Sequence, residues 1–200
     1  VTQDVTIDVQ DVEQWMQIRL ETRDLQGNVI DTIEAGQDFW LQVYLQDVRT
    51  VDPQGVFAAY IDINYDGTLA SAIGVDWHDI SYGDYYRNGK SGDLTTPGLL
   101  DDVGSFGPTA PLDDSEYLQM MIKMSADAAG DILFFGDPGD DIGHGPLVFG
   151  YSAEFSWDRV TILPTALTVT EGALVALDDL YNVDEDSSNV LDVLENDTNE

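Results

Sequence analysis

DFWLQVYLQD (38–47) and VFAAYIDINYD (56–66) are the two stretches that decide the fold of this 200-residue chain. In the first, one side carries only apolar residues: Phe39, Leu41, Val43 and Leu45. A period of two is typical of a half-buried strand, because successive side chains of a strand point to opposite faces. Both stretches therefore predict strands that pack one face into a core.

The same alternation continues on either side of these two stretches. It is clear in WMQIRLETR (15–23), and further strands are expected at 117–125, 131–135, 147–151 and 159–170. Eight or nine short strands, separated by Gly, Pro and Asp, predict an all-β domain with two packed sheets. The stretch 76–116 lacks a clear period, so we expect a long irregular segment that is either functional or an ordered flap.

Composition narrows the classes of function. The chain has 39 acidic and 7 basic residues, a net charge of -32, and the acidic residues are 30 Asp and 9 Glu. Asp favours turns and metal-binding loops, and the missing positive charge excludes nucleic-acid binding and attraction to anionic lipid. Cations relieve such self-repulsion, and calcium is the cation expected outside cells. No apolar run approaches the ~20 residues that span a bilayer, so no membrane insertion is expected.

The region 15–170 resembles the cohesin family. The resemblance is carried by 18–39, an opening strand, a spacer and the start of the second strand; by 55–66, a central strand that ends in Tyr-Asp; and by 118–134, a strand pair joined by Ala128-Ala129-Gly130. It implies a jelly-roll sandwich of about nine strands that binds protein partners, dockerins in the best-known cases. The segment 76–116 is an insertion relative to the compact family pattern.

The two ends resemble a different family. Near the C-terminal end, Asp178-Asp179, Glu185-Asp186 and 191–198 (LDVLENDT) resemble the opening of a bacterial cadherin-like or Ig-like repeat of the VCBS type. VTIDV (5–9) resembles the closing strand of such a repeat. We therefore expect a terminal strand in 1–13, a cohesin-like sandwich in 14–170, and a linker with the start of a repeat in 171–200. Alternatively, the strand is donated to another copy of the chain, because open sheet edges accept strands; its inward residues are Val5, Ile7 and Val9.

Several acidic clusters are candidate calcium sites. The turn DPGDD brings three carboxylates within five residues, and further carboxylate pairs occur along the chain; the candidate ligands are Asp137, Asp140, Asp141, Asp101 and Asp102. The second resemblance adds a junction site with Asp178, Asp179 and Asp186. Carboxylates and carbonyls are calcium's preferred ligands, but each cluster also fits a solvated acidic turn. DINYDG (62–67) starts like an EF-hand loop, but Ile73 stands where Glu is required, so a strand and a turn are expected there.

A second group of candidate site residues is aromatic and polar. The loop 82–90 offers a contact surface for a protein or a sugar through Tyr82, Tyr85, Tyr86, Arg87 and Asn88. The alternative is that its rings pin the 76–116 segment onto the sandwich. The chain has two histidines, His78 and His144, at unrelated loop positions, and no cysteine. The sequence therefore offers no basis for a catalytic triad, a histidine-ligated zinc site or a thiolate metal site.

Together these observations predict a non-catalytic, secreted or cell-surface module of a bacterial array or fibre. It is expected to work through protein–protein contacts, to include copies of itself as partners through strand addition, and to be stiffened by calcium. The alternative is a carbohydrate-binding module of a polysaccharide-associated protein, with the loop 82–90 as its platform.

Overall fold

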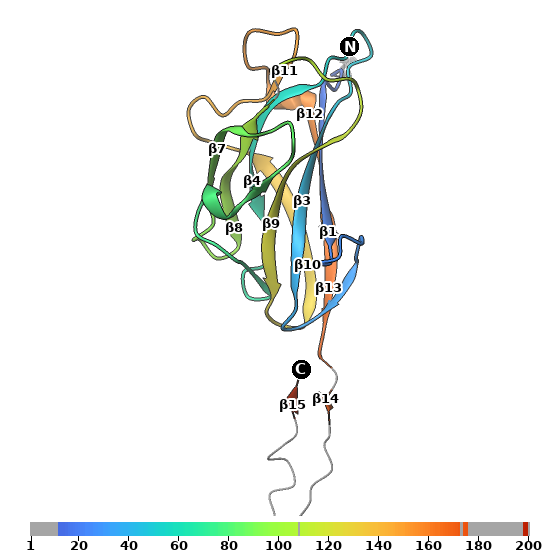
Figure 1. Cartoon of the computed structure of the whole chain (residues 1–200), viewed down its shortest axis with the longest axis vertical. Helices are drawn as coiled ribbons and strands as arrows, with labels where there is room; N and C mark the ends of the chain where they lie inside the picture. Colours follow the sequence, from blue (N-terminus) through green and yellow to red (C-terminus); the bar gives the residue numbers. More distant parts are fainter. Residues whose placement is uncertain (1–11, 108, 173, 176–197, 200) are drawn as a thin grey trace, which may run out of the picture.

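The computed structural model describes residues 12–107, 109–172, 174–175 and 198–199. Two sheets pack face to face into an elongated sandwich, which confirms the all-β, two-sheet prediction (Figure 1). The sandwich strands described run from Met16 to Thr170. The expected terminal strand with Val5, Ile7 and Val9, and the junction carboxylates Asp178, Asp179 and Asp186, lie outside the described residues.

The first sheet has six strands. Their order is β12 (Val160–Leu163), β1 (Met16–Arg23), β3 (Asp38–Asp47), β9 (Tyr117–Ala126) and β5 (Ala70–Ala72), with β6 (Ser81–Tyr82) also paired to β9. The alternation read in 15–23 is the burial pattern of β1: Met16, Ile18 and Leu20 are buried, and the residues between them are partly exposed. β1 runs antiparallel to β3 and parallel to β12.

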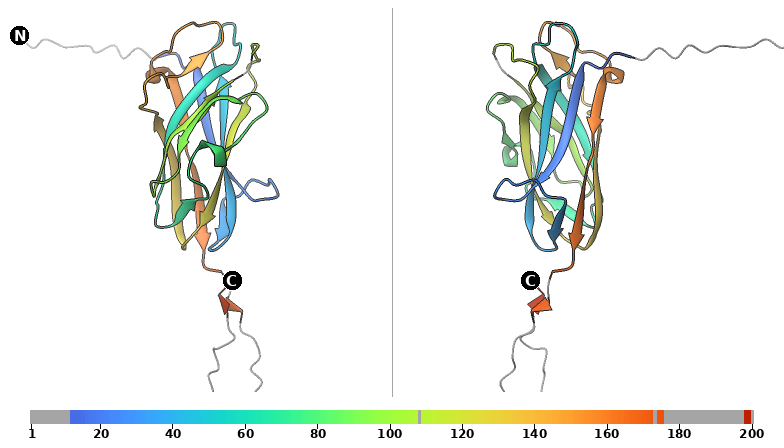
Figure 2. Two further views of the ribbon diagram at one scale, coloured as in Figure 1. Left: turned by 60° about the vertical axis from the view of Figure 1, so that its left-hand side comes forward. Right: turned by 90° about the vertical axis from the view of Figure 1, so that its right-hand side faces the viewer.

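The second sheet has seven strands. Their order is β2 (Thr32–Glu34), β13 (Thr165–Thr170), β10 (Gly130–Pro138), β4 (Val56–Asn64), β8 (Leu99–Phe106) and β7 (Asn88–Asp93), with β11 (Leu147–Val148) also paired to β4. The expected strand at 159–170 is divided at Pro164: β12 joins the first sheet and β13 the second. Figure 2 shows the two layers edge-on. Separately, β14 (Leu174–Val175) pairs with β15 (Thr198–Asn199).

The core lies between the two sheets. Phe39 of β3 and Phe134 of β10 meet across it with ring centroids 6.0 Å apart, and Tyr65 stacks on Phe134 at 5.5 Å. Edge-to-face and offset ring pairs of this kind contribute beyond the area they bury. The rest of the core is aliphatic and includes Ile18, Leu41, Ile61, Leu100, Met120 and Ile122.

The segment 76–116 is not irregular, so that expectation was wrong. It contains the 3-10 turn η1 (Trp77–Asp79) and the strands β6, β7 and β8, and its β7–β8 pair forms one edge of the second sheet. Another 3-10 turn, η2 (Trp157–Arg159), precedes β12. At Gly83 the segment lies so close to β9 that a Cβ atom would meet the carbonyl oxygen of Leu118 at 2.0 Å. Among the described residues, no helix is long and apolar enough to cross a membrane.

Candidate functional site

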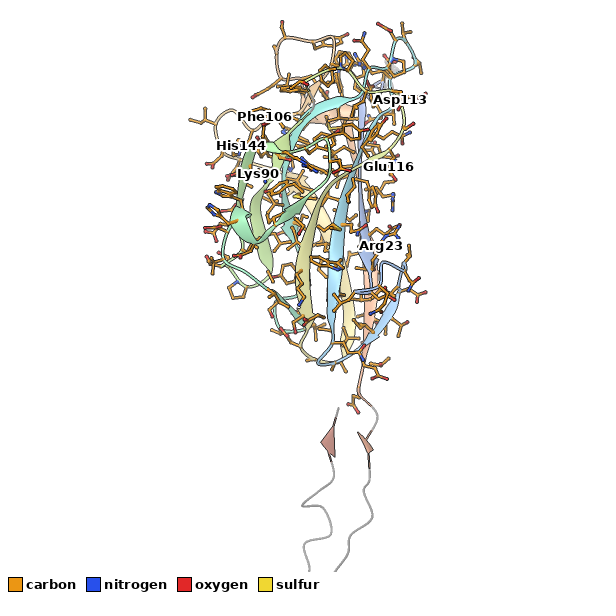
Figure 3. All side chains as sticks on the ribbon, viewed as in Figure 1. Arg23, Lys90, Phe106, Asp113, Glu116 and His144 are labelled. Carbon is orange, nitrogen blue, oxygen red and sulfur yellow. The ribbon has the colours of Figure 1, made fainter. Side chains whose placement is uncertain are left out.

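The outward surface of β10, β4 and β8, called here the outer face, carries the predicted ligands Asp137, Asp101 and Asp102, and the loop that follows β10 carries Asp140 and Asp141. β4 is central, with β10 on one side and β8 on the other. Its inward residues, such as Ile61 and Ile63, are in the core, so Asp62 between them points outward. Figure 3 places His144, Phe106 and Lys90 on one side of the molecule, away from Arg23 and Glu116.

A row of carboxylates crosses the outer face from strand to strand. Asp62 of β4 is directly opposite Asp137 of β10. On the other side of Asp62, the β4–β8 register shifts between Ile61 and Ile63, and Asp101 and Asp102 of β8 fill the bulge. Like charges directly opposite each other in a sheet are destabilising. This part of the sheet therefore carries an electrostatic cost in the protein alone.

The environment of Asp62 reflects this crowding. Burial raises the pKa of Asp62 to about 6; the backbone N–H of Asp102, which donates to it at 2.8 Å, opposes the shift, and neighbouring carboxylates add to it. Burial also raises the pKa of Asp101, and the carboxylates of Asp102 and Asp140 add to this shift. The raised pKa values of both carboxyl groups mean that their ionised forms are disfavoured in the folded chain.

No Lys or Arg offsets this charge. All seven such side chains lie in the described part of the chain, and each has its ion-pair or aromatic partner elsewhere: Arg19, Arg23, Arg49, Arg87, Lys90, Lys123 and Arg159. The nearest group able to carry positive charge is the imidazole of His144, whose Nδ1 is 3.2 Å from Oδ1 of Asp102.

Apolar side chains border the carboxylate row. On β10, Leu133 is 53% exposed and Phe135 is 46% exposed. On β8, Phe106 is 37% exposed and stacks on Phe57 at a centroid distance of 5.6 Å. Alternate residues of a strand share a face, so Leu133, Phe135 and Asp137 stand on the same side of β10. Large apolar groups kept at the surface beside charged ones are typical of contact sites.

The structure brings some of the sequence-predicted calcium ligands together. Three ligand atoms of Asp62, Asp101 and Asp102 lie within 4.8 Å of one another, and so do three of Asp102, Asp141 and His144. Asp137 lies opposite Asp62, while neither Asp137 nor Asp140 belongs to these two groups. Sequence reasoning missed Asp62 and His144 as members. DINYDG forms the end of β4 and a turn, as expected.

The aromatic loop 82–90 is not exposed along its whole length, as a contact platform would be. Tyr86 is 0% exposed, and its hydroxyl donates to the carbonyl of Val56 at 3.0 Å. Tyr82 is partly buried, and its hydroxyl donates to the carbonyl of Ser91. As a contact residue, Tyr86 is therefore corrected: it pins the segment to the sandwich, the alternative that the sequence left open. The contact role of the partly buried Tyr82 stays a prediction. Tyr85, Arg87 and Asn88 are exposed, and their contact role stays a prediction.

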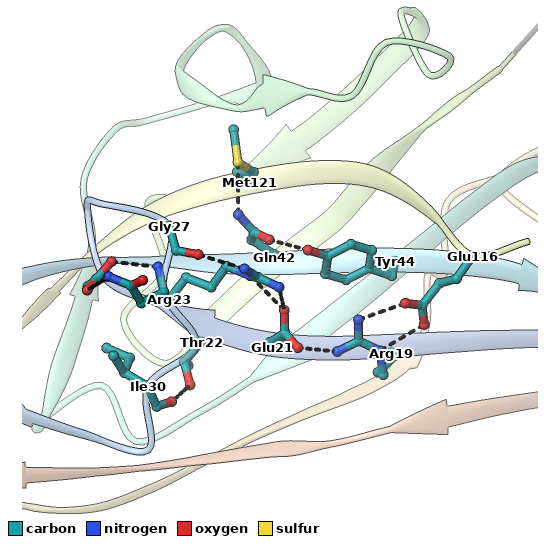
Figure 4. A network of polar contacts seen from close by, with 12 residues as sticks. Arg19, Glu21, Thr22, Arg23, Gly27, Ile30, Gln42, Tyr44, Glu116 and Met121 are labelled. Atoms are coloured by element: carbon teal, nitrogen blue, oxygen red, sulfur yellow. Dashed lines mark hydrogen bonds and ion pairs between the residues drawn. The ribbon is translucent and has the colours of Figure 1, made fainter.

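The opposite sheet carries a paired network instead of a repulsive row. Arg19 donates to both carboxylate oxygens of Glu116, at 2.8 and 2.7 Å, and to Glu21 at 2.6 Å (Figure 4). Arg23 also donates to Glu21, and the Arg19 guanidinium lies over the Tyr44 ring. Because these charges satisfy one another, this surface has no comparable need for a counter-ion.

We expect Asp62→Asn to raise the free energy of unfolding of the metal-free chain by about 1 kcal/mol, because it removes a charge from the row. The amide oxygen can still accept the Asp102 N–H. For a domain of this size, the gain corresponds to a rise in Tm of roughly 2–4 °C in a thermal melt with chelator. Asp131→Asn is the matched control, because Asp131 lies on the same side of β10 but opposite Thr168. An unchanged or lower Tm for Asp62→Asn would show that the row is not a source of strain.

The sequence of this chain matches no protein-family model and no curated protein. Solved structures do match its fold. CaCohA2 of Clostridium acetobutylicum, in its complex with CaDoc0917, superposes with a TM-score of 0.53 at 14% identity, covering 78% of this chain and 99% of that one. The second type II cohesin module of the adaptor scaffoldin ScaA of Acetivibrio cellulolyticus gives 0.52 at 12% identity, covering 81% and 94%.

A third structure, a type II Cohesin–X-Dockerin complex from Acetivibrio cellulolyticus, gives a TM-score of 0.50 at 12% identity, covering 78% of this chain and 99% of that one. These likenesses show that the chain shares the jelly-roll sandwich fold of cohesin modules, which the resemblance in the sequence implied.

Proposed function

We propose that this chain is a non-catalytic, extracellular protein-binding module whose binding surface is the outer face. The observation that carries the proposal is the set of exposed apolar side chains on outward strand positions, Leu133, Phe135 and Phe106, beside the carboxylate row. Binding energy at interfaces is concentrated in a few such anchors, surrounded by polar groups that fix orientation.

The charge of the surface indicates the kind of partner. The row of Asp62, Asp137, Asp101 and Asp102 has no Lys or Arg of its own to pair with, so a partner that presents basic side chains beside an apolar patch is complementary. Complementary charge speeds association and selects among partners. We infer a basic protein domain of the dockerin type, since two of the similar structures are complexes with dockerins or a Doc-named partner.

The proposal extends to a surface array and to calcium. The carboxylate excess of the whole chain, net charge -32, supports a role for a cation in stiffening the module, and calcium fits sites built only from oxygen ligands. The group of Asp62, Asp101 and Asp102 is the described set that has this chemistry. A carbohydrate platform at 82–90 is less favoured, because Tyr82 and Tyr86 face inward.

Carboxylates and aromatic rings surround the two histidines. The side-chain neighbours of His144 are Asp102 and Tyr60, and those of His78 are Asp76 and Trp77. The non-catalytic part of the proposal is based on the fold that the chain shares with cohesin modules.

Titration calorimetry of the chain against a panel of dockerin domains tests the binding surface. We expect binding to at least one member of the panel, weakened at least about tenfold by Phe135→Ala, since truncation of an interface anchor costs over 1 kcal/mol. Val29→Ala is the control, because Val29 is similarly exposed but follows β1, outside the outer face. Binding that Phe135→Ala leaves unchanged contradicts the proposed surface, and a panel without any binder contradicts the proposed partner class.

A further inference from the structure

The loop that follows β10, GDDIGHGP (139–146), folds back onto the outer face. The backbone N–H of Gly139 donates to the carbonyl of Tyr60 at 3.2 Å, and the N–H of Asp141 donates to Oδ2 of Asp102 at 3.1 Å. At Gly139 the fit is close: a Cβ atom there would meet Oδ1 of Asp102 at 2.4 Å. The loop therefore holds its own side chains against β8.

His144 is fixed in place by two different contacts. Its ring stacks on Tyr60 with centroids 4.0 Å apart and planes 9° from parallel. Its Nδ1 faces the carboxylate of Asp102, whose side chain is 8% exposed. A ring nitrogen and a carboxylate oxygen that are 3.2 Å apart can both bind one ion, because Zn–N and Zn–O bonds are about 2.0–2.2 Å long.

The charge around His144 exceeds what one imidazole can offset. Asp102 belongs to both close groups, so Asp62 and Asp101 stand behind it while Asp141 stands beside His144. A protonated imidazole supplies a single positive charge against four carboxylates. A divalent cation supplies two, and the seven Lys and Arg residues, all bound elsewhere, supply none.

We propose that Asp102, Asp141 and His144 bind a divalent transition-metal ion, with Zn²⁺ as the probe. Two carboxylate oxygens and one imidazole nitrogen are ligands that zinc accepts at a site with a remaining position for water. Calcium, in contrast, prefers oxygen ligands alone, so the histidine separates this site from the calcium role proposed above. The bound ion ties the loop 139–146 to β8, and this takes place in the chain by itself, without a protein partner.

Thermal melts and calorimetry of the full chain, first treated with chelator and then titrated with Zn²⁺, test the proposal. We expect Zn²⁺ to raise Tm by roughly 5–10 °C at about 100 times its Kd. His144→Ala is expected to abolish that rise. His78→Ala is the matched control: it removes the only other histidine, which also lies beside a carboxylate, Asp76, and it should leave the rise intact.

A second variant keeps the test valid if His144→Ala does not fold. Asp141 is exposed, so Asp141→Asn should keep the metal-free Tm while weakening Zn²⁺ binding at least about tenfold. Failure of Zn²⁺ to bind the parent chain overturns the proposal and leaves His144 as an ion-pair partner of Asp102. Ca²⁺ that raises Tm as much as Zn²⁺, in the parent and in His144→Ala alike, also overturns it, in favour of the all-carboxylate group. Both results are measured on the chain without a partner, so a failure of the metal proposal is distinguishable from a failure of the dockerin titration.

Discussion

We expect Asp47→Ala to lower the free energy of unfolding by about 3–5 kcal/mol, a cost typical of breaking a buried ion pair. Asp47 ends β3 with a fully buried side chain, and Arg49 beside it is 7% exposed. The guanidinium donates to Asp47 at 2.9 and 2.6 Å, and the backbone N–H groups of Gln54 and Gly55 donate at 2.9 and 3.0 Å. Alanine removes the shared acceptor of these donors, and the guanidinium then keeps only its bond to the carbonyl of Phe149.

Urea unfolding followed by fluorescence measures the effect. The control is Asp84→Ala, because Asp84 forms an ion pair with Arg87 on the open surface, where such pairs contribute about 0–1 kcal/mol. Equal midpoints for the two variants would contradict a stabilising role for the buried pair.

Lowering the pH should reproduce this loss of stability in the parent chain. Burial would raise the pKa of Asp47, but Arg49 and the backbone donors outweigh it and hold the pKa below its ordinary value of 3.8. A lowered pKa in the folded state means that the unfolded chain takes up the proton more readily. The contribution of ionised Asp47 to the free energy of unfolding is therefore complete above about pH 4 and falls as the pH drops further. Because Asp47→Ala lacks this carboxylate, its free energy of unfolding should fall less over the same pH range than that of the parent chain.

Tyr86→Ala is the second change with a large expected effect, about 3–5 kcal/mol, the cost of truncating a buried aromatic side chain. Tyr86 is fully buried, and it fixes the segment between η1 and β7 to the carbonyl of Val56. We expect a Tm lower by roughly 10 °C or more. Tyr86→Phe keeps the ring and loses one hydrogen bond, about 1 kcal/mol.

Tyr85→Ala is the matched control for Tyr86. The two residues are adjacent, but Tyr85 is 47% exposed and contacts Tyr117 edge-on at 5.2 Å. Its removal should change stability by about 0.5 kcal/mol or less. Similar melting of both alanine variants would mean that Tyr86 does not anchor the segment.

The sequence predicted the fold best where one face of a strand is apolar. β1 and β3 were clear because every second residue is buried. β7 (NGKSGD) and β8 (LLDDVGSF) were missed, because neither alternates. In β8 the pattern fails at a bulge, where Asp102 has a φ of 46°, and both Asp101 and Asp102 face Asp62. Tertiary pairing, and not local preference, decides such strands.

The site was predictable in its parts and not in its assembly. Asp101, Asp102 and Asp141 were candidate ligands because acidic pairs in turns favour cations. These residues come together only through the register of β4 with β8 and β10. Asp62 of β4 is 40 residues before Asp102 of β8 and 75 residues before Asp137 of β10. His144 was not among the predicted ligands, because no spacing in the sequence links it to Asp102.

The parallel pairing of β1 with β12 has a mechanical consequence. β1 starts at the upper pole of the sandwich in Figure 1, and β13, which continues from β12, ends at the lower pole. Tension between Met16 and Thr170 therefore pulls β1 and β12 along their lengths in opposite directions. The register from Met16–Val160 to Arg19–Leu163 is then loaded in shear, so its hydrogen bonds share the force instead of unzipping one at a time. A module pulled lengthwise in this way resists extension most strongly along its long axis.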